Sequence, residues 1–319
     1  MTCIFCGKEN EAQSIEHIVS EAFGNKAYLM KRGAVCDDCN QKFSSFEGKA
    51  VSQSVFVMER SRMGIPTKKG GPASGSVGGI KISGAEDFTK NVVHMAGLTS
   101  EMVQNFNPAN GSFQVLVPTF DGTAVPTSKL LLKMALESLH TSQPKIYGRY
   151  DFSTVRAFLL NPATSDWPFM TTDSELTPFI SIPTYSDKYK LNIIRCTLQI
   201  SEVSEKRLLF KFKYGAIPML INLLDKDGIL WMKEHLDADP QAMIYPEHFR
   251  AKFEKRLANQ VAKAVRDSEG PAIEKMEPLP IPDKASNAAR AVSRETEHPA
   301  KSIQETAVVS IANQSTDKV

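Results

Sequence analysis

Four cysteines near the N-terminus have the spacing of a metal site. They form two Cys-x2-Cys pairs, Cys3 with Cys6 and Cys36 with Cys39. Each short pair can point two thiolates at one tetrahedral ion, so this spacing favours zinc over four unrelated buried thiols. A shell of four thiolates leaves no position for water, and we therefore expect a structural zinc. It would staple a module of about fifty residues, whose own hydrophobic core must be thin.

Between the two pairs, in a stretch long enough for a hairpin, Glu16 is followed by His17, and Asn40 directly follows the fourth cysteine. Histidine titrates near neutrality and can take a proton from water, so His17 is a candidate general base. The Glu16 carboxylate and the Asn40 side-chain oxygen are hard ligands suited to Mg²⁺. Neighbouring residues of a strand point to opposite faces, so a bend would be needed for Glu16 and His17 to act together. The alternatives are a structural histidine beside a zinc knuckle and an asparagine that satisfies backbone donors at a helix start.

These residues resemble the HNH endonucleases of the ββα-metal fold. The sequence EHIVSEAFG at 16–24, then VCDDCN at 35–40 and Glu47, is similar to the bacterial type-5 subgroup. Asn40 stands where many members carry their last histidine, and the similar endonuclease VII-type enzymes carry asparagine there. The family's middle asparagine is missing from residues 30–35, and Asn25 is the nearest substitute.

The resemblance implies a function for each of these residues. By analogy, His17 is the general base, and Glu16 and Asn40 bind a catalytic Mg²⁺ or Mn²⁺. The structural zinc would be held by the four cysteines, Cys3, Cys6, Cys36 and Cys39. The implied substrate is DNA, with RNA as the alternative.

The composition sets limits on the partners and the location. The chain has 319 residues, 42% of them hydrophobic and 23% charged, which is typical of a globular protein with about two domains. A net charge of +2 means that any nucleic-acid surface must be local. We see no signal peptide, and the longest apolar stretch, around 216–224, is too short to span a bilayer. Cysteines placed for metal fit a reducing cytoplasm, so we expect a cytoplasmic protein with no membrane partner.

The predicted fold class is α+β, with a zinc-stapled ββα-metal, treble-clef-like module first. The expected elements are a helix from near Asp38 past Glu47, a strand at 113–117, a helix at 128–140, a β-hairpin at 191–200 and 207–214, and a helix at 245–266. The glycine-rich stretch at 70–79 is either a linker or a hairpin tip. The tail has no aromatic residue and cannot build a core, so we expect it to be disordered. The expected parts are the nuclease module at 1–50, a basic segment and linker at 51–79, a larger mixed α+β domain at 80–266, and the tail at 267–319.

Four basic residues after the module, Arg60, Arg62, Lys68 and Lys69, could contact phosphates, but a solvated basic face is an equally good interpretation. Cys196 lies in an apolar strand and is interpreted as a core thiol.

The leading hypothesis is a metal-dependent endonuclease that hydrolyses phosphodiester bonds in DNA, regulated or targeted by its C-terminal domain. A non-catalytic zinc module that binds nucleic acid or protein is the main alternative. In a third interpretation the protein acts through an interaction surface in 80–265, with the zinc module as a scaffold. The oligomeric state does not follow from the sequence.

Overall fold

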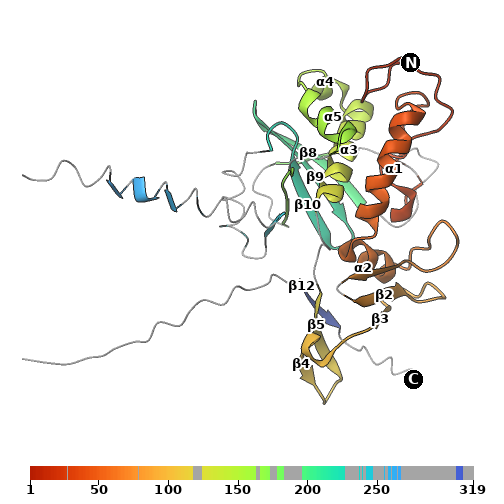
Figure 1. Cartoon of the computed structure of the whole chain (residues 1–319), viewed down its shortest axis with the longest axis vertical. Coiled ribbons are helices and arrows are strands. Elements are labelled where there is room, and N and C mark those ends of the chain that lie inside the picture. Colours follow the sequence, from red (N-terminus) through yellow and green to blue (C-terminus); the bar gives the residue numbers. More distant parts are fainter. Residues whose placement is uncertain are drawn as a thin grey trace, which may run out of the picture. The chain divides into compact units, whose positions relative to one another are not determined.

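The structure is a computed structural model of the whole chain (Figure 1). It describes residues 1–26, 28–77, 79–117, 124–162, 166–172, 178–182, 196–226, 237, 239, 242–246, 255, 258–259, 261–263, 265–266 and 307–311. The described part is mixed α+β, with a four-cysteine cluster at its N-terminus and a larger region of helices and sheets after it. No described helix is both long and apolar enough to cross a membrane.

The N-terminal module contains a short hairpin and a helix. Backbone hydrogen bonds join Ile18 N to Tyr28 O at 2.8 Å and Met30 N to Glu16 O at 3.0 Å, around a bridge between His17 and Leu29. A 3-10 helix, η1 (Glu21–Phe23), lies between these paired segments, and helix α1 (Asp37–Val51) follows them. Acidic residues in the first turn of α1 suit the positive end of the helix dipole. The predicted hairpin and helix are therefore present in the structure.

Helix α2 (Ser54–Arg62) packs on a small antiparallel sheet of β1 (Ser74–Val77), β2 (Ile80–Gly84) and β3 (Val93–Ala96). The glycine-rich stretch is therefore a hairpin, in which β1 and β2 pair directly. Gly75 allows β1 to approach α2 closely, since a Cβ there would lie 2.8 Å from Val57 Cγ2.

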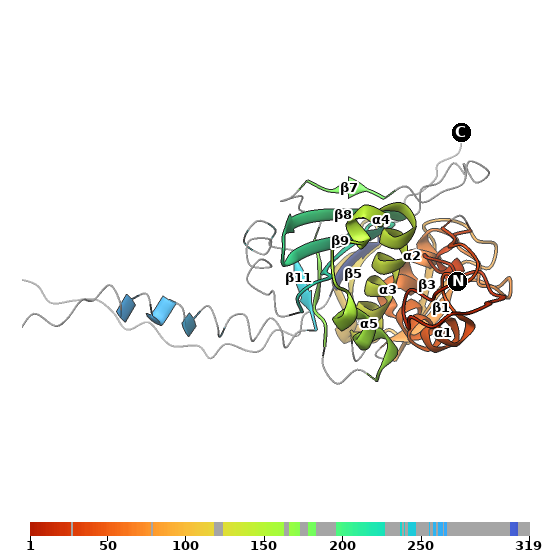
Figure 2. The ribbon, with the colours of Figure 1, turned by 90° about the horizontal axis from the view of Figure 1, so that it is seen from above.

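The larger region is built on a six-stranded antiparallel sheet in the order β11-β6-β10-β9-β8-β7. Helix α3 contacts β9 and β10 of this sheet and also contacts α4 and α5 (Figure 2). Helix α3 is buried along most of its length, with polar and charged side chains as well as apolar ones. The bounds are α3 (Val125–Ser142), α4 (Pro144–Tyr147), α5 (Ser153–Leu160), β6 (Phe169–Thr171), β7 (Ile180–Ser181), β8 (Cys196–Ser204), β9 (Arg207–Tyr214), β10 (Ile217–Asn222) and β11 (Met243–Tyr245).

A third sheet has β5 (Ser112–Val117) at its centre, paired on one side with β4 (Val103–Asn107), which follows η2 (Ser100–Met102), and on the other with β12 (Ala307–Ile311). The tail therefore contains one strand that the sequence analysis did not predict. Its apolar residues pair antiparallel with β5, and this pairing was not visible in a segment with little local pattern. The rest of the tail lies outside the described residues.

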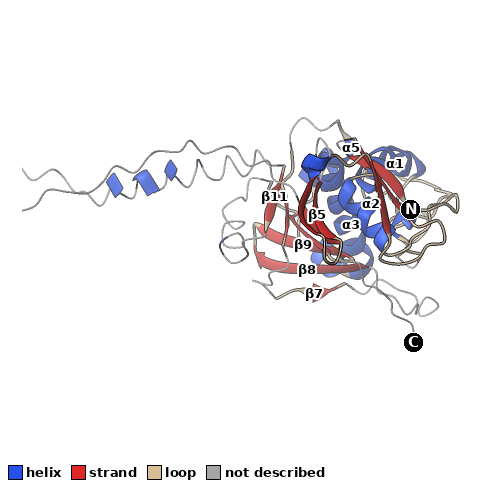
Figure 3. Cartoon of the chain, turned by 90° about the horizontal axis from the view of Figure 1, so that it is seen from below, coloured by secondary structure: helices blue, strands red, loops and turns tan. Residues whose placement is uncertain are grey.

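The zinc module and the larger region share one hydrophobic core. Helix α1 packs against α3, as Figure 3 shows, and a single cluster of buried side chains includes residues of both parts. The Phe23 ring lies 4.6 Å from the Tyr214 ring, and the Tyr214 hydroxyl donates to Phe23 O at 3.3 Å. Residues 1–253 accordingly form one compact unit with the segment 306–319. The domain boundaries at 50 and 79 stay a prediction.

Most of the predicted elements are confirmed. The helix at 128–140 lies within α3, the strand at 113–117 is β5, and the hairpin is β8 and β9, with 191–195 outside the described residues. The predicted helix at 245–266 is wrong at its start. Tyr245 ends β11, where the apolar run Met243–Tyr245 pairs with Phe169–Thr171, and most of the remaining range lies outside the described residues.

Candidate active site and zinc centre

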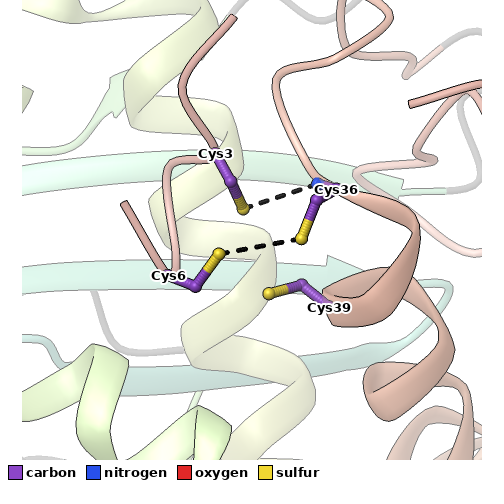
Figure 4. A group of neighbouring side chains, drawn as sticks. All are labelled: Cys3, Cys6, Cys36 and Cys39. Carbon is purple, nitrogen blue, oxygen red and sulfur yellow. Dashed lines mark hydrogen bonds between the residues drawn. The ribbon is translucent and has the colours of Figure 1, made fainter. Parts of the chain in front are cut away.

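The four cysteine sulfurs gather at one point (Figure 4). Their Sγ atoms all lie within 4.8 Å of one another, with 3.7 Å between those of Cys6 and Cys36. Cys3 and Cys6 come from the N-terminal loop, while Cys36 and Cys39 lie at the start of α1. The Cys36 backbone N–H donates to Cys3 Sγ at 3.4 Å, as second-layer donors do around bound thiolates. The donor set and its spacing fit a tetrahedral zinc ion.

The charges of the thiols support the same conclusion. A hydrogen bond with Cys39 lowers the pKa of Cys3 to about 4, and the same contact raises the pKa of Cys39. Burial raises the pKa of Cys36. Without a cation, one thiolate therefore keeps its neighbours protonated. A divalent ion offsets the repulsion between neighbouring thiolates and lets all four cysteines ionise.

We expect about one zinc ion per chain, and Cys36→Ser should lose most of it, because a hydroxyl is a poor substitute for a thiolate. The melting temperature of the variant should also fall, since α1 belongs to the shared core. Elemental analysis of purified protein checks the zinc content, with Cys196→Ser, outside the cluster, as the matched control. Native protein without zinc would contradict the assignment.

His17 presents one free nitrogen. Its Nε2 lies 3.5 Å from Glu21 Oε1, and the other oxygen of Glu21 pairs with Lys68 Nζ at 3.0 Å. Its Nδ1 is buried and has no hydrogen-bond partner among the described residues. A carboxylate beside Nε2 favours the tautomer with the proton on Nε2, which leaves the Nδ1 lone pair free to accept a proton.

Asn25 holds the backbone that follows His17. It is buried, its Nδ2 donates to Val19 O at 2.9 Å, and its Oδ1 accepts from Tyr28 N at 3.4 Å. These two bonds connect the two sides of the hairpin beside His17. Asn25 therefore ties together the two sides of the hairpin that carries His17.

Glu16 points into the protein, away from solvent. Its Oε1 accepts from Lys133 Nζ at 2.6 Å, and the same ammonium group lies 2.6 Å from Glu47 Oε1 and 3.2 Å from Glu137 Oε2. Lys133 also donates to the backbone oxygen of His17 at 3.2 Å. One buried lysine of α3 thus gathers three carboxylates, and the second oxygen of Glu16, Oε2, is buried without a hydrogen-bond partner among the described residues.

The protonation of this Lys133 cluster follows from its burial. Burial alone would lower the pKa of Lys133, but the charges of Glu137, Glu47 and Glu16 together raise it above its ordinary value. Burial raises the pKa of Glu137 well above its ordinary value, against the opposing charge of Lys133. Lys133 is therefore charged, and Glu137 holds its proton more tightly than a solvated glutamate does.

Asn40 lies in the first turns of α1 and contacts Ser14. Its Nδ2 donates to Ser14 Oγ at 3.2 Å, and the Ser14 hydroxyl in turn donates to the Asp37 carboxylate. Asp37 also accepts the backbone N–H groups of Gln13 and Ser14, and the Ser14 hydroxyl bond is the main reason why its pKa is lowered. The start of α1 thereby anchors the segment that leads to Glu16.

The three predicted site residues have separate partners. Glu16 contacts Lys133, His17 faces Glu21, and Asn40 bonds Ser14, and among the described residues no hydrogen bond or ion pair joins two of the three side chains. Glu16 is only 5% exposed, whereas His17 is partly exposed. This difference is expected for neighbours on opposite faces of a strand.

Comparison with known families identifies the module. Residues 3–55 match the family model described as HNH endonuclease. This segment is similar to the HNH endonucleases, and we call it the HNH module. No curated protein and no solved structure matches the chain.

Sequence reasoning missed Lys133, which lies outside the HNH module. A signal was present, because Lys129, Lys133 and Glu137 follow one another at intervals of four among the leucines of α3. That spacing places all three on one face. Lys129 uses the same face differently, donating to the backbone oxygens of Leu159 and Asn161 at the end of α5.

The basic residues after the HNH module are not one solvated face. Arg62 pairs with Glu59, with 2.7 Å between Arg62 Nη2 and Glu59 Oε2, and Lys68 pairs with Glu21. Arg60 is only 6% exposed. The structure therefore separates residues that the sequence grouped together.

Proposed function

We propose that the chain is a metal-dependent endonuclease that hydrolyses phosphodiester bonds in DNA. The observation that carries this proposal is the state of His17 within the HNH module. Its Nε2 faces a carboxylate and its Nδ1 has no partner among the described residues, which is the arrangement a general base requires.

In the proposed reaction His17 Nδ1 accepts a proton from water as the water oxygen attacks phosphorus. The bond from phosphorus to the leaving oxygen breaks, and that oxygen takes a proton from solvent. Glu21 stabilises the imidazolium that forms, because its carboxylate lies beside Nε2. Asn25 keeps the histidine segment in place during this transfer.

Glu16 and Asn40 are the proposed ligands of a catalytic Mg²⁺ or Mn²⁺. The orphaned Glu16 Oε2 supports the fit, because a buried carboxylate oxygen without a hydrogen-bond donor is an available ligand for a hard cation. When bound, such an ion stabilises negative charge on a phosphate. Lys133 holds the other oxygen of Glu16 and thereby orients the carboxylate.

The test is incubation of purified protein with plasmid DNA, with and without Mg²⁺ or Mn²⁺. Nicking or linearisation that requires the ion supports the proposal, and a parallel RNA substrate decides between the two nucleic acids. Absence of cleavage on both substrates favours the non-catalytic binding module. The contact of Glu16 with Lys133 is the observation that favours this alternative, since it occupies one ligand oxygen.

Glu16→Gln and Asn40→Ala should keep full zinc content and lose metal-dependent cleavage, on the order of 10²-fold, because each removes an oxygen ligand and not a thiolate. Cleavage rates over a Mg²⁺ and Mn²⁺ titration, together with elemental analysis, measure both effects.

Two matched controls separate ligand loss from loss of structure. Ser14→Ala removes the hydrogen bond of Asn40 and leaves its side-chain oxygen in place. Glu137→Gln changes the Lys133 cluster without touching Glu16. If the controls lose as much activity as Glu16→Gln and Asn40→Ala, the two residues are not ligands.

Regulation by the region after the HNH module is also part of the proposal. Lys133 of α3 contacts both the side chain of Glu16 and the backbone of His17. A displacement of α3 would therefore act directly on two proposed catalytic residues. The cytoplasmic location stays a prediction.

A further inference from the structure

A pocket of about 300 Å³ opens beside the HNH module, between α1, α2 and the loop that follows His17. Its lining is mixed, with Ala22 and Val51 beside the polar side chains of Arg60 of α2, Lys68, Ser20 and Ser44. Two cationic side chains and several hydroxyl groups around an open hollow are suited to an anion with several acceptor oxygens.

Arg60 is the unusual residue of this pocket. The side chain is buried, yet no described carboxylate pairs with it, and its Nε has no hydrogen-bond partner among the described residues. Burial lowers the pKa of Arg60, which shows that its charge is poorly solvated. A guanidinium without a counter-ion is costly in a folded protein, and an anion bound in the pocket would offset that cost.

The neighbouring acid does not cancel this positive charge. Glu47 also lines the pocket, but its Oε1 lies 2.6 Å from the ammonium group of Lys133. Lys68 pairs with Glu21, and it remains 71% exposed, so it can also reach a ligand.

The pocket is linked to the proposed general base in two ways, by proximity in the sequence and by a series of ion pairs. Ser20 is three residues after His17, and Lys68 contacts Glu21, which faces His17 Nε2. A polyanionic strand that reaches His17 would therefore pass close to this pocket. We infer that the pocket around Arg60 and Lys68 binds a backbone phosphate of the nucleic acid strand and positions its neighbour at His17. This inference rests on the proposed nuclease function.

Binding of a fluorescent DNA duplex to the full chain, without added Mg²⁺ or Mn²⁺, tests the inference independently of cleavage. Arg60→Met should weaken binding about tenfold and reduce the slope of log affinity against log salt by about 0.9, the value for one phosphate contact. Arg62→Met is the matched control from the same helix, because Arg62 already pairs with Glu59, and its slope should stay that of the wild type.

A second pair of variants tests the inference even if Arg60→Met fails to fold. Lys68→Met should also reduce the slope, whereas Lys69→Met should not, and both residues are exposed enough to be replaced without unfolding. Thermal melts with inorganic phosphate form a further arm. If phosphate stabilises the wild type but neither variant changes DNA binding, the pocket takes free phosphate and the inference is wrong.

The two proposals fail in different ways. A chain that cleaves DNA while Arg60→Met and Lys68→Met both bind it like the wild type overturns this inference alone. A chain that never cleaves, yet binds DNA with the expected Arg60 and Lys68 dependence, overturns the nuclease and retains the phosphate pocket.

Discussion

Replacing His17 by alanine is expected to lower the rate of DNA cleavage by about 10²–10⁴-fold, the usual contribution of a general base. The reason is the Nδ1 atom, which has no hydrogen-bond partner among the described residues and so keeps a lone pair that can accept a proton. The fold should survive, because the side chain is 29% exposed and makes a single ion-pair contact. Plasmid nicking rates with matched melting curves measure both effects.

His94→Ala is the control, since it removes an exposed histidine from β3 in another sheet. A well-folded His17→Ala protein that cuts at the wild-type rate would refute the assignment of the base.

Lys133→Met should lower the free energy of unfolding by about 3–5 kcal/mol, the range for removing one partner of a buried ion pair. Glu16 and Glu47 would be left without their cation in a buried site. Denaturant unfolding at several pH values measures the free energy.

Glu137→Gln should change the pH dependence of the free energy of unfolding rather than its value at neutral pH. Its pKa is raised in the folded chain, so its stabilising contribution is fully present below the unfolded pKa and is lost as pH rises through the folded pKa. The glutamine variant should keep neutral-pH stability and lack that decline. Lys129→Met, whose ammonium group binds backbone oxygens, controls for the loss of a buried lysine without facing carboxylates. If Lys133→Met matched the wild type at every pH, the Lys133 cluster would not be a stabilising network.

The sequence predicted those features that depend on local spacing. Cys3, Cys6, Cys36 and Cys39 are recognisable because a tetrahedral ion demands two close pairs, and their sulfurs do gather. Helix α3 is recognisable from the helical spacing of Leu131, Met134 and Leu139. The start of a helix at Tyr245 was wrong, because pairing with β6, far away in the sequence, overrode the local helical pattern.

The partners of the candidate site residues could not be predicted in the same way. Lys133 reaches Glu16 only because α1 packs on α3, and no local pattern encodes that packing. Arg60 and Arg62 look alike in the sequence, but one is buried without a described partner and the other forms an ion pair with Glu59. Their different environments are set by tertiary burial, which a run of basic residues does not reveal.

The contact between Glu16 and Lys133 joins positions 117 residues apart. A ribosome adds about 5–20 residues per second, so roughly 6–23 seconds separate the synthesis of the two side chains. During that interval the hairpin of the HNH module exists without the lysine that neutralises its carboxylate and without the sheet that completes its core. The HNH module is thus synthesised before the region that follows it, and its fold is complete only after that region has been translated.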